Sequence, residues 1–134
     1  MKREDAMGRG TRLALLAPVA LSVALALAAC QSGGTPPRIV KGGSTTIGKD
    51  LIVKYGCGSC HTIPGIRNAN GLVGPPLIHW GRRSMIAGRL PNTPDNLIRW
   101  VHDPQGVEPG TDMPNLGVTQ TEARNIAAYL ENIQ

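Results

Sequence analysis

Phenylalanine is absent from the 134 residues of this chain, and aromatic residues account for only 3% of them. A chain with so few large apolar side chains builds only a thin core from its own residues. Clusters of basic residues interleaved with aromatics are also missing, so the formal net charge of +5 does not point to nucleic-acid binding. No segment shows a convincing strand pattern, and we therefore expect an all-α fold.

Cysteine is scarce as well: there are three, and an odd number cannot all pair in disulfides. Two of them lie in Cys57-Gly58-Ser59-Cys60-His61, which has the C-x-x-C-H spacing of covalent c-type haem attachment. Two thiols at this spacing can add to the two vinyl groups of one haem. The histidine that follows can then present an imidazole nitrogen to the iron. We therefore predict one haem c, bound through Cys57 and Cys60.

A C-x-x-C pair also occurs in zinc sites and in thioredoxin-like dithiols, so the motif alone leaves these alternatives open. Zinc would need two further ligands, and the sequence has no second C-x-x-C pair and no H-x₃₋₅-H pair. A thioredoxin-like dithiol is expected in a chain with a βαβ pattern, which we do not find. A haem would also fill the core that the missing aromatics leave thin, which predicts a poorly folded apo chain.

The third cysteine ends the N-terminal region. Residues 1–29 have the layout of a secretory signal peptide, with a basic leader followed by an apolar run. The end of that run, Leu27 to Cys30, resembles the lipobox of bacterial lipoproteins, whose cysteine is lipidated and becomes the new N-terminus. We therefore expect export to the periplasmic or extracytoplasmic face of a membrane, with a lipid anchor at Cys30. An uncleaved anchor and a lipid-free exported product are the alternatives, and Met7 is an alternative start to Met1.

Composition divides the rest of the chain in two. Residues 30–46 are rich in Gly, Ser and Pro and show no apolar period, which predicts a flexible linker behind the lipidated N-terminus. Residues 47–134 remain for one small domain. Loops are expected over residues 62–92, with one short helix near 82–87. Three longer helices are predicted. Apolar spacing indicates the first over residues 48–55. The second starts at Thr93-Pro94 and stops before Pro104, and the third starts at the capping box of Thr119 and Glu122.

The domain resembles class I cytochrome c, the family of small mono-haem electron carriers, over roughly residues 47–134. Four stretches carry the resemblance in order: a haem-binding segment, a G-P-x-L loop, a helix, and a loop that bears a methionine ligand. They are Tyr55 to Pro64, Gly74-Pro75-Pro76-Leu77, Asn96 to Pro104, and Pro109-Gly110-Thr111-Asp112-Met113-Pro114. The resemblance implies a small cytochrome c fold, with three to four helices and loops around one covalently bound haem.

The resemblance also implies roles for single residues. His61 would be the proximal iron ligand and Met113 the distal one, whose thioether raises the reduction potential relative to a second histidine. The carbonyl of Pro75 would hold the other ring nitrogen of His61. Trp100 would pack near the haem, and Arg82 is the candidate for a propionate contact. The chain is shorter than longer family members between 85 and 93, and no tryptophan matches the propionate partner that some of them have.

Other residues could in principle take these places. Met85 is the second methionine of the domain, and a methionine is more often core filler than a ligand. His79 and His102 could bind iron, although His102 is interpreted as a polar surface residue. Tyr129 is expected to pack between the first and last helices, against Gly48, as the resemblance implies.

The function that the resemblance implies is electron transfer and not enzymatic catalysis. A membrane-tethered carrier would take single electrons from a quinol-oxidising complex or a dehydrogenase and pass them towards a terminal oxidase. Two alternatives remain open: a permanent haem subunit of an oxidase or dehydrogenase complex, and a peroxide-reducing or gas-binding haem protein if Met113 dissociates. The scattered positive charge is compatible with a modest docking patch for an acidic redox partner.

Overall fold

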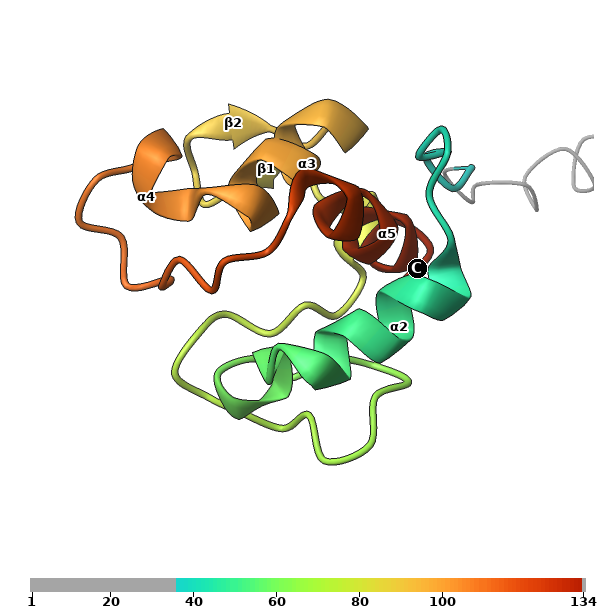
Figure 1. Ribbon diagram of the computed structural model, residues 1–134, viewed down its shortest axis with the longest axis horizontal. Coiled ribbons are helices and arrows are strands. Elements are labelled where there is room, and N and C mark those ends of the chain that lie inside the picture. Colours follow the sequence, from blue (N-terminus) through green and yellow to red (C-terminus); the bar gives the residue numbers. More distant parts are fainter. Residues whose placement is uncertain (1–35, 134) are drawn as a thin grey trace, which may run out of the picture. The chain divides into compact units, whose positions relative to one another are not determined.

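The computed structural model describes residues 36–133. The predicted signal peptide, the predicted lipidation site Cys30 and the first part of the predicted linker therefore lie outside the described residues. The described part is mostly helical, with a single small hairpin (Figure 1). Its elements are α2 (Thr45–Lys54), η1 (Cys57–Ser59), η2 (Trp80–Arg82), β1 (Met85–Ile86), β2 (Leu90–Pro91), α3 (Pro94–His102), α4 (Pro104–Val107) and α5 (Gln120–Glu131), where η denotes a turn of 3-10 helix.

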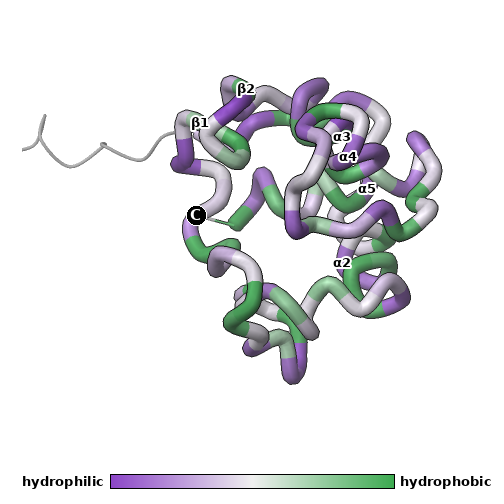
Figure 2. Tube along the Cα trace, turned by 90° about the vertical axis from the view of Figure 1, so that its left-hand side faces the viewer, coloured by the Kyte–Doolittle hydropathy of each residue, from purple (hydrophilic) through white to green (hydrophobic). Residues whose placement is uncertain are grey.

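Side-chain caps fix where the three longer helices begin. The hydroxyl of Thr93 accepts a hydrogen bond from the backbone of the third residue after it, and Pro94 occupies the first position of α3. Thr119 and Glu122 form the predicted capping box at the start of α5. Helix α2 begins three residues before the predicted start at 48, because Ser44 caps it in the same way. The apolar and polar residues that alternate along these helices can be followed in Figure 2.

Helix α5 packs against both α2 and α3 and so forms the centre of the domain (Figure 1). The crossing with α2 is close. A Cβ atom added to Gly48 would lie 2.0 Å from the carbonyl oxygen of Asn125 and 3.1 Å from the Cβ atom of Tyr129. The predicted contact between Gly48 and Tyr129 is therefore present, and only glycine leaves room for it.

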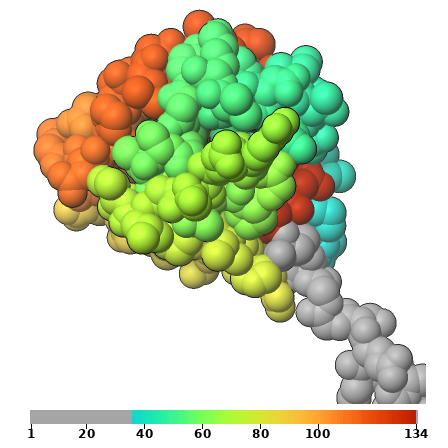
Figure 3. All heavy atoms as spheres, turned by 90° about the horizontal axis from the view of Figure 1, so that it is seen from below, coloured from blue at the N-terminus to red at the C-terminus, as the bar shows by residue number. Residues whose placement is uncertain are grey.

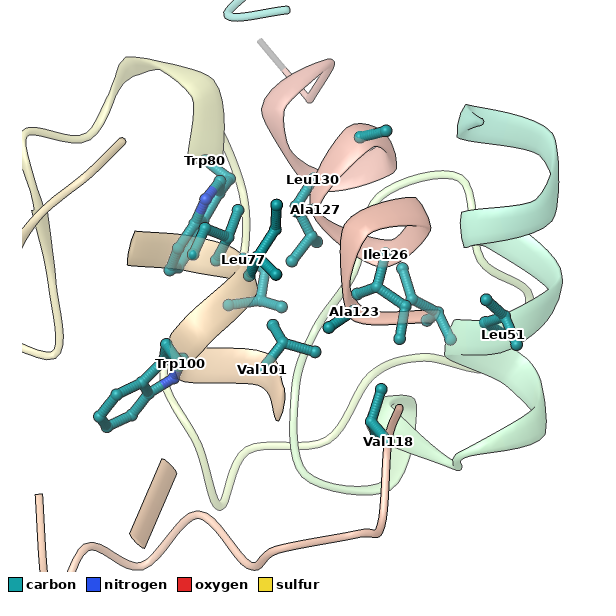
Figure 4. Close-up of a cluster of buried hydrophobic side chains, with 14 of the residues drawn as sticks. Leu51, Leu77, Trp80, Trp100, Val101, Val118, Ala123, Ile126, Ala127 and Leu130 are labelled. Atoms are coloured by element: carbon teal, nitrogen blue, oxygen red, sulfur yellow. The ribbon is translucent and has the colours of Figure 1, made fainter. Parts of the chain in front are cut away.

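The apolar core lies around the inner face of α5. Leu51 of α2 lies at one side of the cluster, and Trp80 and Trp100 lie at the opposite side (Figure 4). The side chains that α5 and α3 contribute to this core are Ala123, Ile126, Ala127, Ala128, Leu130, Leu97, Ile98, Trp100 and Val101.

A carboxylate hub joins the end of α2 to the start of α5. Glu122 accepts hydrogen bonds from Lys54 Nζ at 2.7 Å, from the Tyr55 hydroxyl at 2.7 Å and from the Thr119 hydroxyl at 2.7 Å. These bonds, the one from Lys54 foremost, lower the pKa of Glu122 to about 2. The carboxylate thus stays charged and holds the two helix ends together.

Two elements of the structure were not predicted: a hairpin within residues 62–92, and a short helix that begins at Pro104. Where a short helix was expected near 82–87, the chain forms the turn η2 and then an antiparallel hairpin in which Ile86 pairs with Leu90. Ala87 and Gly88 at its tip both have positive φ, of 48° and 69°, which a helix cannot accommodate. The short helix α4 was not predicted at all: the Asp103 side chain caps it by accepting from the Gly106 backbone at 3.0 Å.

The folded unit also begins before residue 47. Arg38 Nη1 forms an ion pair with Glu131 at 3.1 Å, Val40 is only 6% exposed, and the Ser44 backbone donates to the side chain of Asn125 at 2.9 Å. Residues 38–46, expected to be part of a flexible linker, therefore pack on the domain because α5 supplies partners for them. Within residues 36–133 no helix is both long enough and apolar enough to cross a bilayer.

Candidate functional site

The C-x-x-C-H segment is a tight turn directly after α2. Gly56 adopts the left-handed conformation, with φ 67°, and turns the chain into η1. The backbone N–H groups of Cys60 and His61 then both point to the Cys57 carbonyl, at 3.3 and 3.0 Å. The two half-buried thiols are free and are carried by one short rigid segment.

The environment of Cys57 is apolar. Its side chain packs against the core, and burial raises the pKa of its thiol. A thioredoxin-like dithiol needs the opposite, a lowered pKa that yields a reactive thiolate. Among residues 36–133 there is also no group of three or more His, Cys, Asp or Glu side chains placed to share a metal ion, as a zinc site would require.

The ring of His61 is held in one orientation. Its Nδ1 atom lies 2.7 Å from the Pro75 carbonyl oxygen, so this nitrogen carries the proton and donates, and Nε2 is left to bind a metal. The Gly74 backbone donates to the Cys60 carbonyl at 2.8 Å and passes so close to the ring that an added Cβ would lie 2.4 Å from Cε1 of His61. The predicted contact with Pro75 is present, and the glycine before it makes the close approach feasible.

Met113 lies in the irregular segment between α4 and α5, half-buried against the core. Its backbone carbonyl accepts a hydrogen bond from Gln105, a residue that sequence reasoning missed. Of the alternative ligands, Met85 is 43% exposed in the hairpin and His79 is exposed. The ring of His102 is engaged by the Val118 carbonyl, 2.6 Å from its Nδ1 atom.

The structure buries both tryptophans of the domain, while the predicted propionate contact Arg82 lies at the surface. Trp100 is 7% exposed on α3, whereas the Arg82 side chain is exposed at the surface. Trp80 is 5% exposed, and among the described residues its buried indole N–H has no hydrogen-bond acceptor. Arg83 lies over the Trp80 ring, 5.2 Å from its centroid, and donates to the Pro76 carbonyl. Sequence reasoning passed over Trp80, although a buried indole N–H without an acceptor is the kind of group that a bound acidic ligand satisfies.

These observations fit a covalently attached haem. Two adjacent thiols, an imidazole with a fixed ring and an available Nε2, and a thioether in a half-buried loop are the donor types that c-type haem proteins use. The buried indole N–H of Trp80, which has no acceptor among the described residues, is a donor that a polar group of such a ligand would satisfy. Cys30, the predicted lipidation site, lies outside the described residues.

Comparison with known proteins also indicates a haem-binding domain. The family model described as Cytochrome c matches residues 46–134. A protein named Cytochrome c oxidase subunit 2 from Alkalihalophilus pseudofirmus is 31% identical over 88 residues, which cover 65% of this chain and 25% of that protein. The protein of the same name from Bacillus subtilis is 29% identical over 93 residues, covering 65% and 26%. The chain thus spans about a quarter of the length of the curated relatives it matches.

Proposed function

The chain belongs to the cytochrome c family, and from this premise we propose that it carries single electrons between components of a respiratory chain. The family implies covalently bound haem c and haem electron transfer. In our proposal Cys57 and Cys60 would hold one haem, and His61 and Met113 would be the two protein ligands to its iron. When bound, it supplies an iron that takes up and releases one electron.

The residues of this chain would keep the same ligands on the iron while an electron is taken up and released. The observation that carries the proposal is the 2.7 Å contact between His61 Nδ1 and the Pro75 carbonyl, which fixes the ring and leaves Nε2 as the nitrogen that would bind the iron. Met113 would be the second protein ligand to the iron, and two protein ligands would leave no open position for a substrate. One electron enters from a donor and one leaves to an acceptor, with no bond made or broken in this protein.

The surface beside the attachment segment is apolar. Leu72 and Val73 are 89% and 82% exposed, yet the backbone on both sides of them is tied to the attachment segment. The Gly71 N–H donates to the Gly58 carbonyl at 3.1 Å, and the Gly74 N–H donates to the Cys60 carbonyl at 2.8 Å. In Figure 3 this part of the chain, green to yellow-green, covers the middle of the face that is seen. We propose that the redox partner meets this face through an uncharged surface of its own.

Three of the cations of the domain have partners within it. Lys54 is paired with Glu122 at 2.7 Å, and Arg89 with Glu108 at 2.7 Å. Arg83 is bound to backbone carbonyls. These three cations are engaged within the domain, whereas Arg67 and Arg82 are exposed and could still meet an acidic group of the partner.

Two arrangements of the carrier are distinguished by experiment. In the first, lipidation at Cys30 tethers a free domain to the extracytoplasmic face of a membrane, and it shuttles between a quinol-oxidising complex or dehydrogenase and a terminal oxidase. In the second, the domain is a permanent haem subunit of an oxidase complex, which the likeness to proteins named Cytochrome c oxidase subunit 2 favours. A permanent subunit co-purifies in fixed ratio with larger subunits in mild detergent, whereas a tethered shuttle does not. Cys30→Ala releases a shuttle from the membrane fraction.

The proposal is tested with the full chain, produced in a host that attaches haem. The mass should increase by one haem, and Cys57→Ala with Cys60→Ala should abolish the increase. The reduced protein should then be oxidised by membranes that contain a terminal oxidase. Leu72→Ser with Val73→Ser should slow this oxidation at all ionic strengths, while Ile39→Ser, which changes a residue that is 87% exposed elsewhere, should not. If membranes that contain a terminal oxidase do not oxidise the reduced, haem-loaded unchanged protein, the electron-transfer role is contradicted.

A further inference from the structure

The side chain of Gln105 binds the backbone of the methionine loop at three points. Its Nε2 donates to the Thr111 carbonyl at 2.7 Å and to the Met113 carbonyl at 2.8 Å, and its Oε1 accepts from the Gly110 N–H at 3.2 Å. A flipped amide would place Oε1 against two carbonyl oxygens and Nε2 against an N–H. The three partners therefore define one orientation of the amide, with both of its donors and its acceptor in use.

The base that carries Gln105 is itself fixed. Gln105 lies on α4, whose first turn is capped by the Asp103 carboxylate through the Gly106 N–H at 3.0 Å. The same Asp103 oxygen accepts from the Asn115 side chain at 3.1 Å, which ties the far side of the loop to the same helix end. Figure 1 shows the loop leaving α4 and reaching α5 without a helix or strand of its own. The loop therefore depends on side-chain contacts of this kind for its shape.

We propose that Gln105 is a positioning residue that holds Met113 in place to bind iron. The inference rests on the proposed function, in which Met113 is the distal ligand. Gln105 touches neither iron nor sulfur in this role: it fixes the carbonyl of the ligand residue, the carbonyl of Thr111 and the N–H of Gly110. A loop that is already ordered loses less conformational entropy when its sulfur binds, so the sulfur competes better with any external ligand.

The test compares the haem-loaded full chain with the variants Gln105→Ala and Gln105→Leu, the second of which keeps most of the side-chain bulk without hydrogen bonds and without adding a sulfur. Asn96→Ala is the matched control, because the Asn96 amide donates to the Pro91 carbonyl at 2.9 Å in a different part of the domain. Two quantities are measured in the ferric state: the far-red sulfur-to-iron charge-transfer band and the dissociation constant of added imidazole. Both Gln105 variants should lose band intensity and bind imidazole about tenfold more tightly, whereas Asn96→Ala should do neither.

The inference is overturned if either Gln105 variant that loads haem keeps the band and the imidazole affinity of the unchanged protein. It is also overturned if Asn96→Ala shifts both quantities as much, because the effect would then be general destabilisation. An unchanged protein that itself lacks the band would contradict Met113 ligation, and with it the proposed function. These results separate a failure of the positioning role from a failure of the ligand assignment.

Discussion

Replacing Gly48 by alanine should weaken the contact on which the domain is built. A Cβ atom at this position would lie 2.0 Å from the carbonyl oxygen of Asn125 and 2.7 Å from its carbonyl carbon. Both obstacles are backbone atoms of α5, so no side-chain rotation removes the clash. Helices α2 and α5 would have to separate by more than an ångström at their crossing.

The magnitude is set by two opposing effects. Alanine is favoured over glycine inside a helix by about 1 kcal/mol, which stabilises the variant. Overpacking costs about 1–3 kcal/mol and more where backbone must move, and a gap of about 0.5–1 Å already forfeits about a quarter to a half of each dispersion contact along the crossing. Because backbone atoms must move, we take the upper overpacking figure, and after subtracting the gain from alanine we expect a net loss of about 2 kcal/mol in the free energy of unfolding.

Urea unfolding of the haem-loaded protein, followed by circular dichroism, measures this loss. For a domain of this size it corresponds to a midpoint lower by about 1–2 M. Lys49→Ala is the control, because this neighbouring residue of α2 is exposed and should change stability by less than about 0.5 kcal/mol. A Gly48→Ala midpoint at or above that of the unchanged protein would refute the packing argument.

Three further changes probe contacts that hold the domain together. Glu122→Gln should lower the free energy of unfolding at neutral pH. The variant should also lose less of this free energy than the unchanged protein when the pH is lowered. The carboxyl pKa, about 2 because of hydrogen bonds from Lys54 above all, lies below its ordinary 4.5, so its stabilisation is full above pH 4.5 and is lost as pH falls towards 2. Tyr129→Phe removes a 2.7 Å hydrogen bond to the Pro64 carbonyl and should cost about 0.5–1.5 kcal/mol in urea unfolding. Arg38→Ala removes the ion pair with the buried carboxylate at the end of α5; because Arg38 is 28% exposed, we expect about 1–3 kcal/mol in thermal unfolding, less than for a fully buried pair.

Each of these changes has a result that would count against it. An acid-unfolding profile of Glu122→Gln that overlays that of the unchanged protein would mean that the hub contributes no pH-dependent stability. Equal unfolding midpoints for Tyr129→Phe and the unchanged protein would show that the hydrogen bond to the Pro64 carbonyl contributes nothing to stability, because water binds the hydroxyl equally well in the unfolded chain. Lys41→Ala, an exposed neighbour in the same segment, is the control for Arg38→Ala, and equal losses in both would remove the role of the ion pair.

Local signals in the sequence predicted the helices well. Thr93 and Thr119 cap helices through bonds that span three residues, so their partners are visible in the sequence itself. The contact between His61 and Pro75 was implied by the likeness of the surrounding segments to a known family, and the structure places the two atoms at 2.7 Å. Contacts between residues close together in the sequence, and contacts that a family pattern implies, could therefore be predicted.

The features that were missed depend on partners that only the fold brings together. Arg38 and Val40 lie in a stretch whose Gly and Pro content indicates a linker, yet Arg38 finds its partner 93 residues further along the chain. Strands of two residues are too short to show an alternating pattern. Gln105 is an ordinary polar residue until the loop folds back over α4. No sequence period or motif marks such contacts, because they depend on the final path of the backbone.

The optical spectrum of the full chain, matured in a host that attaches haem, tests the central claim most directly. It is recorded in the oxidised state, in the reduced state, and in the reduced state under carbon monoxide. Ligation by His61 and Met113 predicts a far-red sulfur-to-iron band when oxidised, a sharp low-spin α-band when reduced, and no change with carbon monoxide. A high-spin spectrum or ready binding of carbon monoxide would contradict it, and would favour a peroxide-reducing or gas-binding haem protein over an electron carrier.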